Sequence, residues 1–193
     1  MLKTVFLYFV TKYLKGNDIH AVTRQLAKDT RVVIINAFFS ALVFLRSMDA
    51  LDSEEYTPPT SALMAAAHEG NAKIFAIFGG QGNIEEYFDE LADIYTTYTT
   101  LVQDYVEEMA AVLREHAKSD DASVFHSKGL DIMGWLRNPD SKPDVAYLVS
   151  APVSLPLIGL VQLMHYYVML KVRTAKTSPI SAVELSRKYV YSV

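Results

Sequence analysis

The stretch that decides the fold class covers residues 73–82 and reads Lys-Ile-Phe-Ala-Ile-Phe-Gly-Gly-Gln-Gly. Its apolar part, Ile74 to Phe78, is short and continuous, which is typical of a strand buried on both faces. The glycines that follow at once indicate a tight turn. We therefore predict an α/β protein with mainly helical content, in which a buried strand near 73–78 leads directly into a turn.

The glycine turn allows several functions. Glycines between a strand and a helix can bring backbone N–H groups to a phosphate. This turn, however, lacks the Gly-Lys-Ser/Thr of a phosphate-binding loop, and Glu85 stands where a dinucleotide-binding turn has its third glycine. Two interpretations stay open: plain turn glycines, or an oxyanion hole in which the Gln81 amide donates a hydrogen bond while Gly80 and Gly82 allow a close approach.

The region before the turn is helical in pattern. Helical spacing occurs over 4–14, 18–28 and 31–47, and Gly16 closes the first of these segments. Acidic residues and two prolines at 49–60 indicate a linker, which a short helix at 61–70 follows. We therefore predict an N-terminal helical region at 1–57, a linker and short helix at 58–72, and a second domain at 73–193.

The region after the turn has helical patterns at 85–98, 101–116, 129–137 and 155–171. The stretch from Val145 to Leu170 has 26 residues without an aspartate, glutamate, lysine or arginine, and it is the strongest membrane candidate. Pro152 and Pro156 interrupt it, so we predict a core strand or loop followed by a core helix, and no membrane partner. On that apolar helix, His165 is predicted to be a hydrogen-bonded core residue.

Charge and residue usage exclude several functions. The 193 residues carry 18 basic and 22 acidic side chains, a net charge of −4, which disfavours a nucleic-acid partner. The chain has no cysteine, so disulfides and thiolate nucleophiles are excluded. Its five histidines lack the spacing of a helical zinc site, and we expect no metal and no bound cofactor. No Gly-x-Ser-x-Gly nucleophile elbow occurs in the 193 residues.

Several ordered blocks together resemble the fungal fatty acid synthase beta subunit, in its N-terminal helical region and the start of its starter (acetyl) acyltransferase domain. The resemblance covers roughly residues 10 to 175. The blocks are Tyr13–His20, Phe75–Asn83, Glu86–Leu91, Lys128–Pro139 and Tyr147–Tyr166. They are long and keep the family's order, so they are much more specific than the glycine turn alone.

The resemblance implies an α/β-hydrolase-like core with a small inserted subdomain. In that family a serine on a Gly-His-Ser-x-Gly elbow attacks acyl-CoA, a later histidine is the base, and the acyl group passes to acyl carrier protein. Gln81 matches the glutamine of the family's Gly-Gln-Gly turn near the oxyanion hole, and Gly80 and Gly82 would shape the substrate approach. The implied partners are fatty acid synthase subunits and acyl carrier protein, and the implied location is cytoplasmic.

The chain departs from the family at its end, because residues 178–193 only echo the connection that leads to the elbow. We therefore expect an N-terminal fragment with an incomplete acyltransferase core. It would be related to acyl-carrier-protein S-acetyltransferase but inactive alone, since a covalent mechanism without its nucleophile retains only residual effects. The alternative is a non-catalytic helical interaction protein that docks on synthase subunits or associates with itself through the incomplete core.

Overall fold

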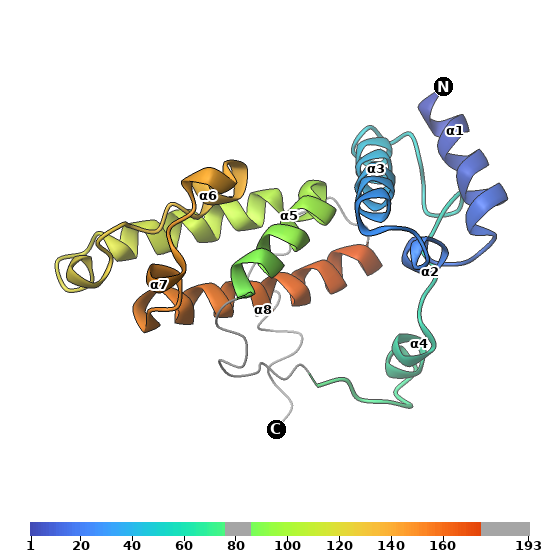
Figure 1. Cartoon of the computed structure of the whole chain (residues 1–193). Helices are drawn as coiled ribbons and strands as arrows, with labels where there is room; N and C mark the ends of the chain where they lie inside the picture. Colours follow the sequence, from blue (N-terminus) through green and yellow to red (C-terminus); the bar gives the residue numbers. More distant parts are fainter. Residues whose placement is uncertain (76–85, 175–193) are drawn as a thin grey trace.

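The computed structural model describes residues 1–75 and 86–174 of the 193-residue chain, and most of these residues are helical (Figure 1). The α-helices are α1 Leu2–Phe9, α2 Ile19–Thr23, α3 Lys28–Ser47, α4 Ala62–His68, α5 Tyr87–Ala117, α6 Ile132–Arg137, α7 Val145–Leu148 and α8 Ala151–Thr174. A π-helical turn, η1 Val10–Leu14, and two 3₁₀ turns, η2 Ser123–Phe125 and η3 Pro139–Ser141, complete these elements.

The predicted α/β fold, with a buried strand near 73–78 and an α/β-hydrolase-like core, is wrong: no strand occurs in the ranges 1–75 and 86–174. Ile74 and Phe75 are 40% and 75% exposed and belong to no regular element. Residues 76–78 lie outside the described residues. A strand needs a neighbour for its backbone N–H and C=O groups, and the described residues supply no second strand. The five-residue apolar run was therefore too short to establish an α/β class.

The N-terminal helices enclose a small aromatic core. Phe6 of α1 stacks on Phe38 of α3, with ring centroids 5.4 Å apart, and meets the Tyr56 ring edge-on at 5.5 Å. The chain reverses after η1 through Lys15 and Gly16, which have φ angles of 49° and 81°. The predicted closing role of Gly16 is confirmed, because this left-handed conformation costs glycine little.

The larger core lies between α5 and α8, with α6 and α7 covering one end. Figure 1 shows the second half of α5 running alongside α8 in the opposite direction. Leu91 and Val106 of α5 are fully buried in this core together with Leu157 and Met164 of α8. Burying side chains of this size contributes about 1.5–3 kcal/mol each. Apolar packing of the two long helices therefore holds this part of the chain together.

Helix α5 has a kink at Tyr98, whose backbone angles are φ −121° and ψ 27°. The Thr99 hydroxyl donates to the Tyr95 carbonyl at 2.7 Å, a local bond that bends helices. At the kink the Asn36 amide of α3 donates to the Thr96 carbonyl at 2.8 Å. Tyr98 also packs against the N-terminal core. The kink is thus the place where the two cores meet.

Two prolines shape the start of α8. In a continuous helix, residue 152 would donate its N–H to the Leu148 carbonyl, and residue 156 would donate to the Pro152 carbonyl. Both positions are prolines and have no N–H. Side chains from elsewhere contact these carbonyls instead: the Tyr87 hydroxyl donates to Leu148 at 2.9 Å, and the His126 Nε2 lies 3.2 Å from the Pro152 oxygen.

These contacts let the chain stay helical across a stretch for which the prolines predicted a strand or loop. Val145–Leu148 is α7, and α8 begins at Ala151 and continues through Pro156. The predicted start of this helix at Leu155 is therefore wrong.

Among the described residues, two helices, α3 and α8, are long and apolar enough to cross a membrane by length and composition. Within the structure 28% of the tested stretch of α3 and 44% of that of α8 are buried. The side of α8 that carries Leu157 and Met164 packs against α5.

Candidate functional site

The predicted site residues Gly80, Gln81 and Gly82 lie within 76–85, outside the described residues. The structure does describe the helix that follows them. Glu86 is the N-cap residue of α5, and the first turn of that helix carries Asp89 and Glu90. The contacts of residues 87–90 show how the start of α5 is attached to the rest of the fold.

Tyr87 anchors the start of α5. Its side chain is 3% exposed, and its hydroxyl donates to the Leu148 carbonyl at the end of α7. Burial raises the pKa of the Tyr87 hydroxyl well above its usual value, because the phenolate would lose its hydration. The group therefore stays protonated and serves as a hydrogen-bond donor.

The next two residues tie α5 to α6 and to the segment before α7. The Phe88 ring meets the Trp135 ring of α6 edge-on, with centroids 5.9 Å apart. Lys142 Nζ lies 2.9 Å from Asp89 Oδ1 and 5.7 Å from the centre of the Phe88 ring. Contacts with α6, with α7 and with Lys142 before α7 thus hold residues 87–89 at the start of α5.

Glu90 links the same helix start to α8. Its Oε1 lies 2.7 Å from His165 Nε2, and both side chains are about half exposed. The prediction of a hydrogen-bonded core histidine is correct for the bond and wrong for the burial. The apolar neighbours of His165 suggested a core position, whereas its own side chain faces the acidic start of α5.

A second polar cluster joins α2 to the kink of α5, and sequence reasoning found its cap but missed its contact with α5. Asp18 caps α2: its Oδ1 accepts from the His20 backbone N–H at 2.7 Å and lies 2.6 Å from His20 Nδ1. The other ring nitrogen of His20 lies 3.0 Å from the Tyr98 hydroxyl. The His20 hydrogen bond holds the pKa of the Asp18 carboxyl below its usual value, and burial raises that of Tyr98. The helical pattern at 18–28 predicts a cap at Asn17 or Asp18, and Asp18 is the cap in the structure.

The contacts of the described histidines support binding and positioning. The ring nitrogens of His20, His126 and His165 contact carboxylates, backbone carbonyls and a phenol. Across residues 1–75 and 86–174, no three histidine, aspartate or glutamate side chains gather in a way that could hold a metal ion. The described contacts thus fix the start of α5 against α6, α7 and α8.

Comparison with known families accounts for both parts of the chain. Residues 1–45 match the model described as the N-terminal domain in fatty acid synthase subunit beta. Residues 76–185, more than half of the chain, match the model described as the starter unit:ACP transacylase in aflatoxin biosynthesis. The chain therefore belongs to the starter unit:ACP transacylase family.

Curated relatives are similar over most of the chain. A fatty acid synthase subunit beta of Saccharomyces cerevisiae is 43% identical over 166 residues, 84% of this chain and 8% of the relative. The fatty acid synthase beta subunit TOXC of Cochliobolus carbonum is 38% identical over 165 residues, 83% of this chain and 8% of the relative. The resemblance to fungal fatty acid synthase beta subunits is thus confirmed, and the chain spans about 8% of the length of these relatives.

Proposed function

We propose that this chain takes part in the transfer of a starter acyl group from acyl-CoA to acyl carrier protein, as a segment of a fatty acid synthase beta-type acyltransferase. The match of residues 76–185 to the transacylase family supports the proposal. The observation that carries it is the attachment of the start of α5, where Tyr87, Phe88 and Glu90 contact α7, α6 and α8. A rigid attachment of this kind suits a turn that must present donors at a fixed place.

The proposed role of Gln81 is to donate its amide hydrogen bond to the oxyanion that forms when a nucleophile attacks the thioester carbonyl. Gly80 and Gly82 would let the substrate approach the backbone closely, because glycine has no Cβ. Stabilisation of developing negative charge is often the largest single contribution to acyl transfer. These three roles rest on the family resemblance and on the motif.

The proposed nucleophile is a serine outside these 193 residues. The sequence has no Gly-x-Ser-x-Gly elbow, and the curated relatives are far longer than this chain. By themselves the 193 residues would neither become acylated nor transfer acetyl groups. Incubation of the purified chain with radiolabelled acetyl-CoA and carrier protein tests this, and label on either protein would contradict it.

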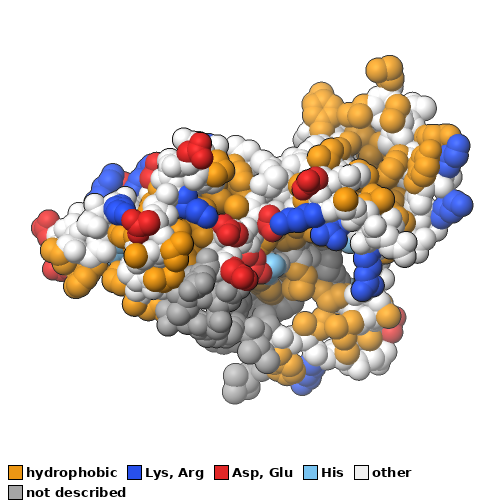
Figure 2. Space-filling view, in the orientation of Figure 1, with side chains coloured by type: hydrophobic (Ala, Val, Ile, Leu, Met, Phe, Trp, Pro, Cys, Tyr) orange, Lys and Arg blue, Asp and Glu red, His pale blue; other side chains and the backbone are white. Residues whose placement is uncertain are grey.

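The proposed partners are the remaining parts of a fatty acid synthase and its acyl carrier protein, in a cytoplasmic location. Figure 2 shows hydrophobic side chains spread over the N-terminal helices, where Leu2, Val5, Phe44 and Met48 are 44% to 64% exposed. Apolar side chains gathered on one surface are typical of an interface. Such a surface also supports docking between copies of the chain. The proposed domain organisation is unchanged: an N-terminal helical region at 1–57, a linker and short helix at 58–72, and a partial acyltransferase domain at 73–193.

A chimera tests the proposed function. Residues 1–193 would replace the homologous segment of the Saccharomyces cerevisiae relative, and acetyl transfer from acetyl-CoA to carrier protein would be measured. We expect the chimera to transfer acetyl groups. In the chimera, Gln81→Ala should lower kcat by about 10²–10³-fold, the usual effect of losing one oxyanion donor. Gln103→Ala removes an exposed glutamine of α5 that pairs with Glu107, and it is the matched control.

Two outcomes would contradict the proposal. A correctly assembled chimera that transfers no acetyl group would show that these residues cannot serve the acyltransferase. Equal rates for Gln81→Ala and Gln103→Ala would remove Gln81 from the oxyanion hole and would leave the wider assignment in place.

A further inference from the structure

The kink of α5 lies in a stretch where the helix is weak by composition. Residues 96–100 read Thr-Thr-Tyr-Thr-Thr, and Tyr98, whose non-helical backbone angles make the kink, is at the centre. Threonine and tyrosine lose side-chain freedom in a helix and have lower helix propensities than alanine or leucine. The sequence of this stretch therefore allows a bend without fixing it, and contacts with other elements can decide its shape.

Helix α3 contacts α5 on both sides of the kink. The Asn36 amide donates to the Thr96 carbonyl at 2.8 Å, before the kink. The Ser40 and Thr100 hydroxyls lie 2.6 Å apart, after it. These contacts join the two parts of the chain that match different family models, residues 1–45 and residues 76–185.

Helix α2 supplies the contact at the kink itself. The Tyr98 hydroxyl lies 3.0 Å from His20 Nε2, and the centroids of the two rings are 5.9 Å apart. Both rings also pack against Phe39 of α3, with centroid distances of 5.9 Å for His20 and 6.0 Å for Tyr98. The N-terminal region therefore surrounds the one side chain of α5 that leaves the regular helix geometry at the kink.

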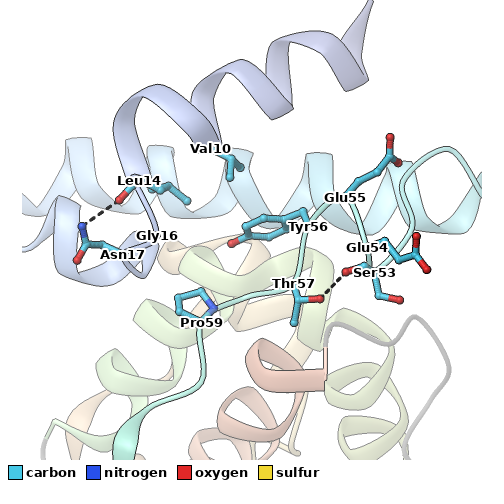
Figure 3. A pocket seen from close by; sticks show the side chains of 10 residues that line it. All are labelled: Val10, Leu14, Gly16, Asn17, Ser53, Glu54, Glu55, Tyr56, Thr57 and Pro59. Carbon is cyan, nitrogen blue, oxygen red and sulfur yellow. Dashed lines mark hydrogen bonds between the residues drawn. The ribbon is translucent and has the colours of Figure 1, made fainter.

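His20 is itself held in place by the turn before α2. In that turn Asn17 Nδ2 donates to the Leu14 carbonyl at 3.0 Å; Figure 3 shows this bond, where the turn forms one wall of a cavity of about 300 Å³ beside Tyr56. Asp18 then caps α2, and its Oδ1 lies 2.6 Å from His20 Nδ1. Both nitrogens of the His20 ring thus have a partner.

The charge states of the two partners decide which ring nitrogen carries the proton. The hydrogen bond from His20 holds the pKa of the Asp18 carboxyl below its usual value, so this group is ionised and can only accept. Burial raises the pKa of Tyr98, so its hydroxyl keeps its proton and can donate. A neutral imidazole has one donor and one acceptor nitrogen. Nδ1 of His20 is therefore the donor to Asp18, and Nε2 is the acceptor from Tyr98.

We propose that the hydrogen-bond chain from Tyr98 through His20 to Asp18 is a conformational device by which the N-terminal region fixes the bend of α5. The chain acts where the helix is weakest by composition. It holds the bend between the start of α5, where residues 87–90 contact α6, α7 and α8, and the second half of the helix, which packs along α8. The N-terminal region thereby controls the shape of a helix that belongs to the other part of the chain.

Imidazole nitrogen chemical shifts of the full 193-residue chain, labelled with ¹⁵N, test the direction of the hydrogen-bond chain. The sample is kept at about pH 8, above the range in which histidines usually titrate. We expect the proton of the His20 ring on Nδ1 and none on Nε2. His68, an exposed histidine in the last turn of α4, is the control and should show the tautomer mixture of a free imidazole. This measurement needs no substitution, so it stays informative even if a variant fails to fold.

Amide hydrogen exchange tests whether the chain fixes the bend. Tyr98→Phe keeps the ring and removes the hydroxyl, and it should speed exchange at residues 99–102 about two- to tenfold, as expected for the loss of one hydrogen bond. Exchange at residues 157–164 of α8 should not change. Tyr105→Phe, further along α5, is the matched control. His20→Phe should act like Tyr98→Phe, and the double variant should add little, because both substitutions remove the same bond.

A proton on Nε2 of His20 would overturn the proposal. So would equal exchange at residues 99–102 in Tyr98→Phe and Tyr105→Phe, or full additivity of the His20 and Tyr98 substitutions. Equal acceleration in α8 would overturn it as well, because the hydroxyl would then act on overall stability and have no particular effect on the bend. Every readout is taken on the 193-residue chain, so none of these outcomes bears on acyl transfer.

Discussion

Substitution of Tyr87 by phenylalanine is the sharpest test of how the start of α5 is held. The substitution keeps a ring that is 97% buried and removes only the hydroxyl that donates to the Leu148 carbonyl. Residue 152 is a proline, so no backbone N–H four residues on can replace this donor. A buried carbonyl left without a partner costs about 1–3 kcal/mol, and we expect Tyr87→Phe to lower the free energy of unfolding by about 2 kcal/mol.

The assay is urea unfolding of the 193-residue chain followed by circular dichroism, with thermal melting in parallel. For a chain of this size, about 2 kcal/mol corresponds to a fall in Tm of about 4–8 °C. Tyr13→Phe on the exposed side of η1 is the matched control, and it should change the free energy of unfolding by less than about 0.5 kcal/mol. If both variants unfold alike, the hydroxyl does not anchor α5 and the argument from the prolines fails.

Three other substitutions or conditions test the same structure. Burial raises the pKa of Tyr56 and of Tyr167 to about 12 each. Phenols of the unfolded chain titrate near pH 10, so the unfolded state loses these protons at lower pH than the folded state does. The free energy of unfolding should therefore fall between about pH 10 and 12. A urea midpoint that stays constant over that window would refute this. Asp18→Ala removes the cap of α2 and should lower the free energy of unfolding by about 1 kcal/mol at pH 7, against little change for the exposed Asp121→Ala. Hydrogen bonding lowers the pKa of Asp18 below 3.8, so the difference between the two variants should shrink as the pH falls below that value. A difference that does not depend on pH would contradict the role of the Asp18 carboxylate. His126→Ala leaves the Pro152 carbonyl without its side-chain partner and should lower the free energy of unfolding by about 0.5–1.5 kcal/mol. His68→Ala, at an exposed histidine, should not lower it. Equal urea midpoints for the two variants would argue against the contact of His126 with Pro152.

The sequence predicted the helices well where an apolar face was long and repeated. The pattern at 31–47 matches α3, where Ile35, Phe39 and Leu42 are buried as their spacing indicates. The pattern at 18–28 was less reliable, because α2 covers only Ile19–Thr23 and α3 begins at Lys28, and Val22 and Leu26 are 38% and 41% exposed. Three apolar residues at helical spacing do not reveal whether a neighbour covers them.

The errors near α8 have one physical cause. Pro152 and Pro156 predicted a break, which is the right expectation when the freed carbonyls have no donors. Tyr87 and His126 contact these carbonyls from positions 61 and 26 residues away. The hydrophobic pattern of α8 contains no information about these partners. The same limit explains His165, whose exposed bond to Glu90 joins residues 75 positions apart.

The candidate site was only partly accessible to sequence reasoning. Gly80, Gln81 and Gly82 were singled out from a motif and a family resemblance, and they stay predictions. The cap at Asp18 has a local signature, whereas the contact of His20 with Tyr98 depends on how α2 meets the kink of α5. The cavity beside Tyr56 combines residues 10–17 with residues 53–59, and no motif marks either segment.

The most direct test of the central claim locates the acyl group on the working enzyme. The chimera that carries these 193 residues would be mixed with acetyl-CoA, quenched during turnover, digested and analysed by mass spectrometry. The account predicts an acetyl ester on a serine outside residues 1–193, and unmodified peptides throughout those residues. An acetyl ester on a serine within residues 1–193, formed at the rate of turnover, would contradict the claim that this chain supports acyl transfer without supplying the nucleophile.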